Sequence, residues 1–578
     1  MILKALYDYY QRCDGLAPFG MEYKEIGFVI VISKYGDFLR FEDNRKDKAS
    51  ATSFLVKKHV SRTAGIAPNY LYDNSSYVFG YSKASTDKDA KKDLDCFSAF
   101  AEKVKGICER FPECGELNAL KRFYNMPRDL ILAQLKQDPL WEEVEKNLSK
   151  KFSNFSFRIN GDTELIAEKQ EILQLSEDND KKKSKNATCL ITGQKGVPVE
   201  TTTSTMIPGS QATAKLVAFQ VNSGYDSYGK SKCFNAPISA EAEFAYTTAL
   251  NRLLASGSRN KFMIGSRTYV FWASSESDAA KGVEEGLFDM FSFADSADHD
   301  NPNEGIEKVR AVFDAVYTGK IRTGLADKFY ILGLEPNSAR IAVVFWQETP
   351  LKEFAANILR HFSDMDMGKT KRPYYGLRDM LGAVTLSKKH TDATPNLPDA
   401  VIKSVFQGTP YPYTLFSSVI RRIRAERDVA FYGGPCRLAI IKAYLNRIND
   451  NNKKIEIMLD KENTNLGYLC GRLFAVLEKI QEDANGTNTV RDRYMNAASA
   501  TPAAVFPTIL NLSLHHAQKL SQGGEVWFEK IKQEIIGKMP AGGFPAHLGL
   551  QDQGRFFVGY YHQRQDLFKK KEDKEEKE

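Results

Sequence analysis

Several features that define common protein classes are missing from this 578-residue sequence. It contains no apolar run of roughly 18 residues or more, so no membrane-spanning helix is expected. Its first residues lack the apolar core and the small-residue cleavage site of a secretory signal peptide. Its eight cysteines include no C-x-x-C pair, which argues against a zinc ribbon and favours reduced thiols. We therefore expect a cytoplasmic protein with no membrane partner, no metal site and no cofactor.

The signatures of common active sites are missing as well. There is no G-x-S-x-G elbow, no H-E-x-x-H zinc motif and no His-Asp nuclease motif. His515 and His516 are adjacent on a predicted helix, where neighbouring side chains point apart and could not share a metal. The acidic stretch Asp295–Asp300 offers the residue types of metal ligands but is more typical of a solvated loop. We expect no catalytic residues.

One motif does match a phosphate-binding pattern. Gly224–Ser231 fits G-x-x-x-x-G-K-S, the P-loop, and follows a predicted strand at Leu216–Phe219. A P-loop must run straight into a helix whose first amides hold the phosphate. Here a Pro-containing segment intervenes before the helix predicted over Ser239–Leu254, and no convincing Walker B strand is present. A Gly-rich surface loop is the preferred interpretation, and an ATP-dependent enzyme stays an alternative; the loop could still bring Lys230 and Lys232 to a nucleic-acid backbone.

Hydrophobic periodicity predicts an α+β protein whose strands lie in the N-terminal half and whose C-terminal part is helical. Helical spacing dominates over residues 93–150, over 305–318 and from about residue 351 onward. We expect domains at 1–350 (α+β), 351–455 (a helical connecting region) and 456–578 (a helical bundle). The predicted strands are Glu25–Ile32, Phe38–Phe41, Ser76–Gly80, Ser153–Asn160, Leu216–Phe219, Tyr269–Trp272 and Arg340–Trp346.

The last 120 or so residues carry the clearest helical pattern. Four amphipathic stripes separated by short loops predict a bundle that could fold alone. Their apolar positions are Leu466, Leu469, Leu473, Leu477 and Ile480; then Phe506, Leu510 and Leu514; then Phe528, Ile531 and Ile535; then Phe556, Tyr560 and Leu567.

Loops that mix cations, hydroxyls and amides are candidates for nucleic-acid contact. The net charge of +7 permits a polyanionic partner without requiring one. Lys57–Tyr70 combines lysines, an arginine, hydroxyls and an asparagine beside an aromatic ring, and similar mixtures recur at Thr192–Gly196 and Gly209–Gln211. Lys and Arg can neutralise phosphates, and Asn can read base edges. Taken alone, each loop is more typical of an ordinary solvated surface.

Short segments that follow one another in order along nearly the whole chain resemble the large-subunit family (Csd-type) of type I-C CRISPR surveillance complexes, known as Cascade. They are Leu6–Tyr10, Leu16–Pro18, Lys24–Phe28, Ser61–Asn74, Cys189–Gly193, Ser227–Gly229, Asn235–Pro237, Tyr246–Asn251, Pro373–Leu377 and Gly559–Arg564.

The resemblance implies a non-catalytic DNA-binding subunit near the 5′ end of the CRISPR RNA. Its N-terminal region would recognise a short protospacer-adjacent motif (PAM) in duplex DNA and open the duplex there, so that R-loop formation by the guide follows. The implied partners are the CRISPR RNA-containing complex with its backbone subunits and RNA-end-capping subunit, small subunits that match its own C-terminal region, target double-stranded DNA and a separate helicase–nuclease. A purely structural scaffold remains a second alternative.

Residue assignments within this function rest on side-chain chemistry. Cations are expected to contact phosphates, and amides to read base edges or to wedge the duplex. The candidate DNA-binding residues are Lys57, Lys58, Arg62, Thr63, Asn69, Asn74, Gln194, Lys195, Gln211, Lys230 and Lys232, with Arg555, His562 and Arg564 of the bundle as candidates for the displaced strand.

The resemblance also implies that the C-terminal bundle can be produced separately from an internal start. Met458 is the candidate because it precedes the first strong helical stripe of the bundle. Alternatively, Met458 is simply an apolar residue that follows Ile455 and Ile457.

Overall fold

A computed structural model of the chain describes residues 1–46, 50–60, 62, 65–83, 86–148, 153–175, 187–205, 207–220, 226, 228–292, 302–324, 326–368, 374–429, 435–448, 454–486 and 489–575. Apart from the first two residues, these form two compact units. The first comprises residues 3–203 and 218–250, and the second comprises residues 204–217 and 251–578. Each unit is described by itself.

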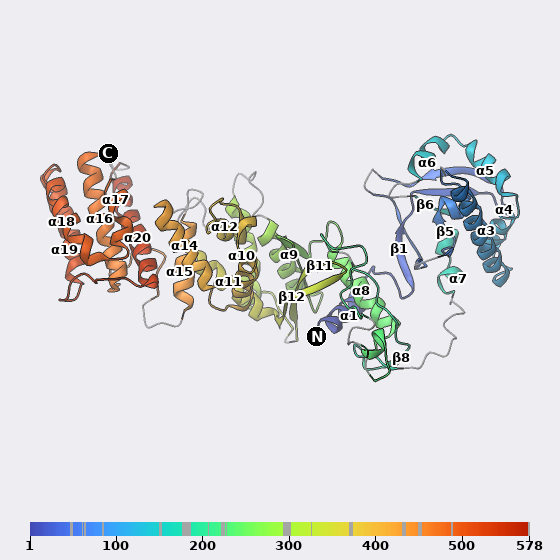
Figure 1. Ribbon diagram of the computed structural model, residues 1–578, viewed down its shortest axis with the longest axis horizontal. Helices are drawn as coiled ribbons and strands as arrows, with labels where there is room; N and C mark the ends of the chain where they lie inside the picture. Colours follow the sequence, from blue (N-terminus) through green and yellow to red (C-terminus); the bar gives the residue numbers. More distant parts are fainter. Residues whose placement is uncertain are drawn as a thin grey trace. The chain divides into compact units, whose positions relative to one another are not determined.

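The first unit combines one four-stranded sheet, two short strand pairs and several helices (Figure 1). Its strands are β1 (Met21–Glu25), β2 (Phe28–Ile32), β3 (Phe38–Asp43), β4 (Ser53–Lys57), β5 (Tyr72–Asn74), β6 (Asn154–Ile159), β7 (Ala187–Thr188) and β8 (Lys195–Gly196). Its helices are α1 (Ile2–Arg12), α2 (Ser75–Val78), α3 (Asp87–Arg110), α4 (Gly115–Phe123), α5 (Arg128–Lys136), α6 (Trp141–Asn147), α7 (Gln170–Leu173) and α8 (Ala240–Leu254), with the 3-10 turns η1 (Ile166–Glu168) and η3 (Lys232–Asn235).

The four-stranded sheet has the order β3-β2-β6-β5, with β2 parallel to β6 and the outer strands antiparallel. Every residue of β2 is buried, which explains its unbroken apolar sequence, because a central strand covered on both faces needs no polar alternation. Helices α3 to α6 gather around this sheet (Figure 1), and Phe123 of α4 and Trp141 of α6 contact Phe157 and Phe41 of its strands. The predicted strands at Phe38–Phe41 and Ser153–Asn160 are confirmed.

Two strand predictions in the first half need correction, and a third is divided. Ser76–Gly80 is wrong as a strand: helix α2 forms instead, because the Asn74 side chain accepts a hydrogen bond from the Ser76 amide at 3.1 Å and caps it. Leu216–Phe219 is also wrong, since the segment forms no ladder and only Lys215 makes a single bridge, with Arg340. Glu25–Ile32 divides into the end of β1 and all of β2.

The second unit begins with an antiparallel sheet of order β12-β11-β10-β9. Its strands are β9 (Lys261–Ile264), β10 (Arg267–Ala273), β11 (Lys328–Asn337) and β12 (Arg340–Pro350), which confirm the predictions at Tyr269–Trp272 and Arg340–Trp346. The hairpin β11–β12 shifts register at Gly333, where an added Cβ would lie 2.8 Å from Phe345 and from Tyr269. Only glycine therefore fits there.

From residue 351 onward the regular structure in the described residues is almost entirely helical, as predicted. Buried aromatic and aliphatic side chains of these helices and of one sheet face form one continuous core that runs from Phe262 to Leu567. The helices of the second unit are α9 (Asp278–Ser292), α10 (Pro302–Thr318), α11 (Leu351–Met365), α12 (Leu377–Gly382), α13 (Leu397–Gln407), α14 (Tyr413–Glu426), α15 (Cys436–Arg447), α16 (Leu466–Asn485), α17 (Thr489–Ala498), α18 (Pro502–Ala517), α19 (Gln522–Gly537) and α20 (Leu550–Glu575), with the turn η5 (His390–Asp392).

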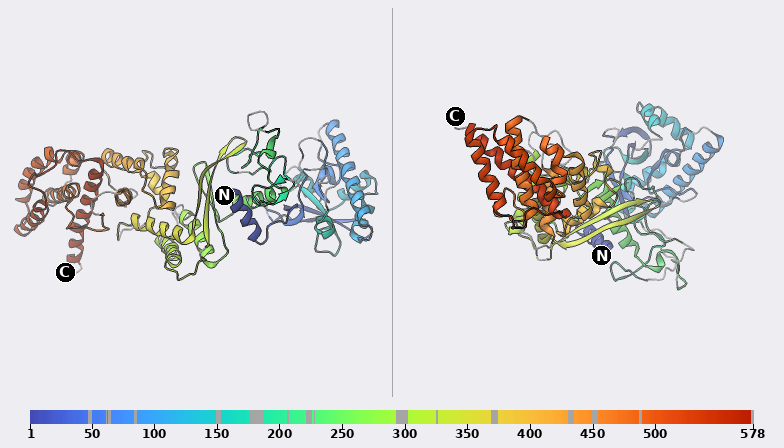
Figure 2. Two further views of the ribbon diagram at one scale, coloured as in Figure 1. Left: turned by 90° about the horizontal axis from the view of Figure 1, so that it is seen from below. Right: turned by 60° about the vertical axis from the view of Figure 1, so that its left-hand side comes forward.

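Helix α16 is the central element of the C-terminal bundle, and all its residues from Gly467 to Gln481 are buried. It packs against α17, α18, α19 and most extensively α20 (orange to red in Figure 2). Backbones of α16 and α20 approach closely at glycines: a Cβ on Gly471 would clash with the Phe556 carbonyl, and one on Gly559 with the Tyr468 carbonyl. Leu514 of the predicted second stripe is instead 54% exposed, because the buried face of α18 runs through Phe506, Ile509 and Ser513.

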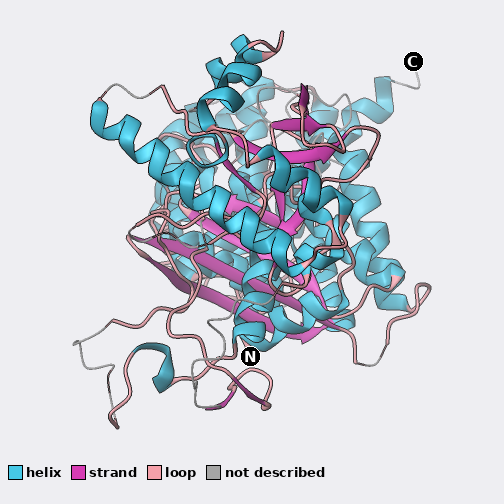
Figure 3. Cartoon of the chain, turned by 90° about the vertical axis from the view of Figure 1, so that its right-hand side faces the viewer, coloured by secondary structure: helices cyan, strands magenta, loops and turns pink. Residues whose placement is uncertain are grey.

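The mixture of sheets and helices confirms the α+β class (Figure 3). None of the helices in the described part of the chain combines the length and the apolar character that a membrane crossing requires. The predicted domain limits at 351 and 456 stay predictions.

Candidate nucleic-acid interface

The segment from β4 to β5 of the first unit is organised by a buried carboxylate. Asp73 is 1% exposed, and its Oδ2 accepts hydrogen bonds from the Arg62 guanidinium and from the Asn69 amide, the latter at 2.9 Å. Its Oδ1 accepts from the Asn74 amide at 2.9 Å. The Arg62 guanidinium also donates to the Ala67 carbonyl at 2.7 Å, so one carboxylate fixes the course of the loop at several points.

A second carboxylate holds the start of the same loop. Glu22 on β1 accepts from the His59 amide at 3.1 Å, from the Tyr72 hydroxyl at 2.8 Å, and pairs with His59 Nδ1 at 2.9 Å. Burial alone would raise the pKa of Glu22, but the hydrogen bond and charge of His59, with Lys24 and Tyr72, lower it below its ordinary value. Glu22 is therefore a carboxylate at neutral pH and keeps His59 at the surface, where its side chain is 49% exposed.

Several predicted DNA-binding residues of this segment bond within the protein. Lys57 donates to the carbonyls of Leu173, at 3.2 Å, and Leu175. Asn69 is 7% exposed and accepts from the Val60 amide, while Asn74 caps α2. These residues shape the loop, and their assignment as DNA contacts stays a prediction.

Other predicted residues of the segment lie nearer the surface. The Arg62 guanidinium lies 4.1 Å from the Tyr77 ring centroid and its side chain stays 28% exposed. Lys58 lies 5.2 Å from the Phe244 ring centroid. Thr63 is outside the described residues.

A second group of predicted residues gathers where the β7–β8 hairpin meets the segment before α8. The Leu190 amide donates to the Pro237 carbonyl at 2.9 Å, and the Val199 amide to the Ile238 carbonyl at 3.0 Å. Gln194 and Lys195 are exposed on the hairpin, and Lys230 is exposed on the neighbouring loop.

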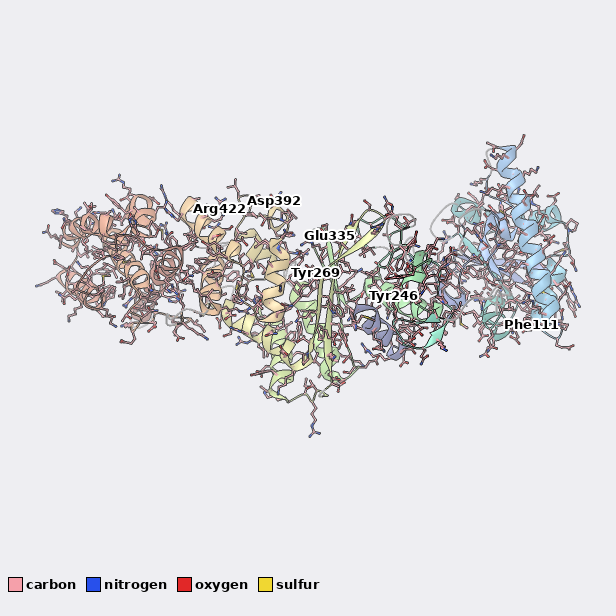
Figure 4. All side chains as sticks on the ribbon, turned by 60° about the horizontal axis from the view of Figure 1, so that its bottom comes forward. Phe111, Tyr246, Tyr269, Glu335, Asp392 and Arg422 are labelled. Atoms are coloured by element: carbon pink, nitrogen blue, oxygen red, sulfur yellow. The ribbon has the colours of Figure 1, made fainter. Side chains whose placement is uncertain are left out.

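Further contacts tie this region together. Lys232 is ion-paired with Glu200, and α8 begins within a residue of the predicted start, with Tyr246 buried on it (Figure 4). Burial would raise the pKa of Cys189, but hydrogen bonds from Ser239 and Thr192 lower it to about 7.

Gln211, another predicted DNA-binding residue, belongs to the second unit. There it is exposed, and its backbone amide donates to the Ser338 carbonyl at 3.4 Å.

The P-loop pattern lacks the surroundings that phosphate binding needs. Its preceding strand does not form, the turn η3 follows the motif, and α8 begins only at Ala240. Part of the motif lies outside the described residues, as does Asp295–Asp300. Among the residues that the structure describes, no cluster of three or more His, Cys, Asp or Glu side chains could hold a metal ion.

Comparison with known families decides the chain's membership. The family model described as CRISPR-associated protein (Cas_Csd1) matches residues 6–568. The chain belongs to the Csd1 family. This agrees with its resemblance to the large subunit of type I-C complexes and makes it a CRISPR-associated protein of the Cascade-subunit kind. A comparison with curated proteins gave no match.

In this Csd1-family chain, the candidates for the displaced strand lie inside the C-terminal bundle. Arg555 is 3% exposed and donates to Asp552 at 3.2 Å. His562 is 1% exposed and shares a hydrogen bond of 3.0 Å with the Tyr468 hydroxyl, and burial lowers its pKa to about 4, so the ring is neutral at pH 7. Arg564 pairs with buried Glu478 at 3.2 Å. Their role at the displaced strand stays a prediction.

Sequence reasoning missed two residues that organise the candidate interface, Glu22 and Asp73. Glu22 and Asp73 carry no motif, and each is an isolated acid beside strand residues. The available signal was local: Asp73 lies between a tyrosine and the helix-capping Asn74, within a segment already singled out for Arg62 and Asn69. A carboxylate there balances the arginine, a pairing that depends on the fold and that the sequence order does not reveal.

Proposed function

We propose that this chain is the non-catalytic subunit of a type I-C CRISPR interference complex that recognises the PAM in duplex DNA, promotes unwinding and R-loop formation by the CRISPR RNA, and helps to recruit the helicase–nuclease. Membership of the Csd1 family supports the setting in a Cascade-type complex. The observation that carries the DNA-reading role is a set of contacts around the loop between β4 and β5, where half-buried Glu22 and buried Asp73 bond to its described residues His59, Arg62 and Asn69.

These contacts suit the task because residues that are already held in place lose less conformational entropy when they bind. The carboxylates hold Arg62 and His59 at the loop, with the exposed Ile66 in the same segment. Lys58 adds a cation nearby in the sequence. Guide RNA would then read the rest of the target by base pairing.

The phosphate contacts in this proposal come from surface lysines. Lys195 and Lys230 are exposed in one region of the first unit, with the amide of Gln194 beside them. Each phosphate that a lysine neutralises releases counterions, so target binding should weaken steeply as salt rises.

The test is a DNA-binding titration of the reconstituted complex with and without this chain. The duplexes differ only in the bases that flank the guide-matched site. The proposal expects affinity to depend on the flanking bases only when the chain is present. Equal flank dependence without the chain would assign PAM reading to another subunit and favour the scaffold alternative.

The same preparation tests the ATP-dependent alternative. Lys230→Ala should leave any ATP hydrolysis by the purified complex at background, as in the wild type. A hydrolysis activity that disappears in this variant would overturn the non-catalytic assignment.

We also propose that Met458 is the internal start of a separate small subunit spanning 458–578. On its N-terminal side, Ile455 is tied to Asn446 by two hydrogen bonds of 2.8 and 2.9 Å. On its C-terminal side, the Asp460 amide donates to the Tyr468 hydroxyl at 3.1 Å, within the bundle. A chain that begins at Met458 would keep the hydrogen bond to Tyr468 and the packing among α16–α20, and would lose the tie to Asn446 together with the contacts of α20 to α14 and α15.

Expression of the gene in cells tests this start. Met458 is 59% exposed, so Met458→Leu should leave the long chain folded and abolish the short product on a denaturing gel. Met495→Leu, inside α17, is the matched control and should leave the short product in place. A short product that persists in Met458→Leu would exclude this start.

A further inference from the structure

The turn that ends at η3 has an unusual backbone. Tyr228 and Lys232 have φ angles of 51° and 52°, and Gly229 between them has a φ of 70°. Side chains other than glycine are disfavoured in this left-handed region, because the Cβ crowds the neighbouring carbonyl oxygen. Residues kept in such conformations concentrate at sites where function requires a fixed geometry.

Three hydrogen bonds hold the described residues of this turn in place. The Asn235 side-chain amide donates to the Lys230 carbonyl at 2.9 Å, and the Lys232 amide donates to Asp226 at 3.4 Å. The amide of the fully buried Cys233 donates to the Glu200 carbonyl at 3.2 Å. The turn is thus anchored at its base while its tip projects into solvent.

The residue at the tip is an aromatic ring with almost no protein around it. Tyr228 is 98% exposed, and no other large apolar side chain in the described part of the chain is more exposed. The next cation along the turn, Lys230, is exposed as well. An exposed ring beside a cation is an arrangement with which proteins hold unpaired nucleotides, since the ring stacks on a base and the cation neutralises its phosphate.

We propose that Tyr228 stacks on an unpaired nucleobase of the complex's nucleic acid and that Lys230 contacts the adjacent phosphate. This inference rests on the proposed function and deepens it, because it names the residue that holds a base freed from pairing. The unpaired strand is either DNA at the opened duplex or the guide RNA, which offer the same base and phosphate chemistry.

The first experiment measures target DNA affinity of the reconstituted complex. Tyr228→Ala should weaken binding roughly tenfold, the loss that stacking on one base produces. Tyr228→Phe, which keeps the ring, should bind like the wild type. Tyr228→Gly removes the backbone strain of the left-handed conformation, so this variant should fold normally yet bind as weakly as Tyr228→Ala. Tyr35→Ala is the matched control, because Tyr35 is 62% exposed and lies beside Lys34 but has no left-handed backbone.

The second experiment identifies the strand. A photo-crosslinking phenylalanine derivative at position 228 of the full chain, in the assembled complex, should give a product that DNase or RNase shortens. DNase sensitivity assigns the base to the target, and RNase sensitivity assigns it to the guide. Crosslinks to protein alone, or full affinity in Tyr228→Ala, would overturn the inference.

The two failures are distinguishable in the same titration. If wild-type complex shows flank-dependent binding and Tyr228→Ala does too, with equal affinity, only the stacking role is wrong. If the wild type itself shows no flank dependence, the PAM-reading function is wrong.

Discussion

The β4–β5 loop and the C-terminal bundle both bury charged groups, but they use them differently. At the end of the loop, buried Asp73 of β5 accepts hydrogen bonds from a surface arginine and from two backbone amides. In the bundle, fully buried Glu478 of α16 lies 3.2 Å from Arg564 of α20 and 3.9 Å from Arg491 of α17, and joins helices to one another. The same residue types thus shape a surface in one region and an interior in the other.

A cation's exposure depends on the position of the acid that pairs with it. Arg62 keeps 28% of its side chain exposed because Asp73 lies beneath it. Arg564 is drawn between helices because Glu478 occupies the most buried helix of the bundle. Variants that remove either pairing test this contrast.

The largest effect is expected from the glycine contact between α16 and α20. Gly471→Ala should destabilise the chain by about 3 kcal/mol, because the new Cβ would overlap the Phe556 carbonyl and separate the helices that carry the buried charges. Urea unfolding of the full chain measures this loss of stability. Gly523→Ala on α19 is the control, since no atom lies within 4 Å of its added Cβ, and it should not destabilise.

Removing a cation from the bundle should have the next largest effect. Arg564→Ala removes the 3.2 Å contact of buried Glu478 and leaves the longer contact to Arg491, and we expect the chain to become less stable by about 2 kcal/mol at pH 7. A double variant, Arg564→Ala with Glu478→Leu, should recover much of this stability because the fully buried carboxylate is gone. Equal stability of the single variant and the wild type would show that the pair contributes nothing.

The pH dependence of this variant follows from the raised pKa of Glu478. Burial raises it, and the charge of Arg564 opposes the rise. A folded-state carboxyl with a raised pKa binds its proton at a higher pH than the unfolded chain does, so stability falls as pH rises through the folded-state value. The destabilisation by Arg564→Ala should therefore shrink as pH falls from 7 toward 5, and a deficit that grows on acidification would contradict the account.

A smaller effect is expected at Glu22. Its lowered pKa means that it contributes stability above the ordinary glutamate pKa, and that this contribution disappears as pH falls through the folded-state value. Glu22→Gln should lower the stability of the chain by about 1 kcal/mol at pH 7 and by less in acid. Thermal unfolding at several pH values tests this, and a pH-independent difference would show that the carboxylate charge plays no part.

The smallest expected effect lies on the exposed lysines. Lys195→Ala combined with Lys230→Ala should reduce the slope of log affinity against log salt by about 0.9 for each phosphate that is no longer neutralised. Binding titrations of the complex over a range of salt measure the slope. Lys88→Ala on α3, also exposed, is the control, and an unchanged slope in the double variant would remove both lysines from the interface.

The local spacing of apolar residues predicted most of the helices and strands, but it did not predict the function of individual charged residues. The alternating segment Ser153–Asn160 and the helix over Ser239–Leu254 formed as expected because their apolar spacing matches a partner surface. The strand predicted at Ser76–Gly80 is replaced by helix α2, which the Asn74 side chain caps. The strand predicted at Leu216–Phe219 does not pair with another strand. The local apolar pattern does not reveal either outcome. Arg555 and His562 resemble surface contacts in the sequence, and only the packing of α20 shows that they are buried.

In the proposed function, Asp73 shapes the loop that reads the flanking bases. The most direct test compares complexes carrying wild-type chain, Asp73→Asn or the control Lys88→Ala, each titrated with duplexes whose flanking bases match or do not match the preferred sequence. We predict that Asp73→Asn lowers the ratio of the two affinities at least about tenfold, the discrimination that one base contact supplies, while Lys88→Ala leaves it unchanged. An unchanged ratio in a correctly assembled Asp73→Asn complex would contradict the claim.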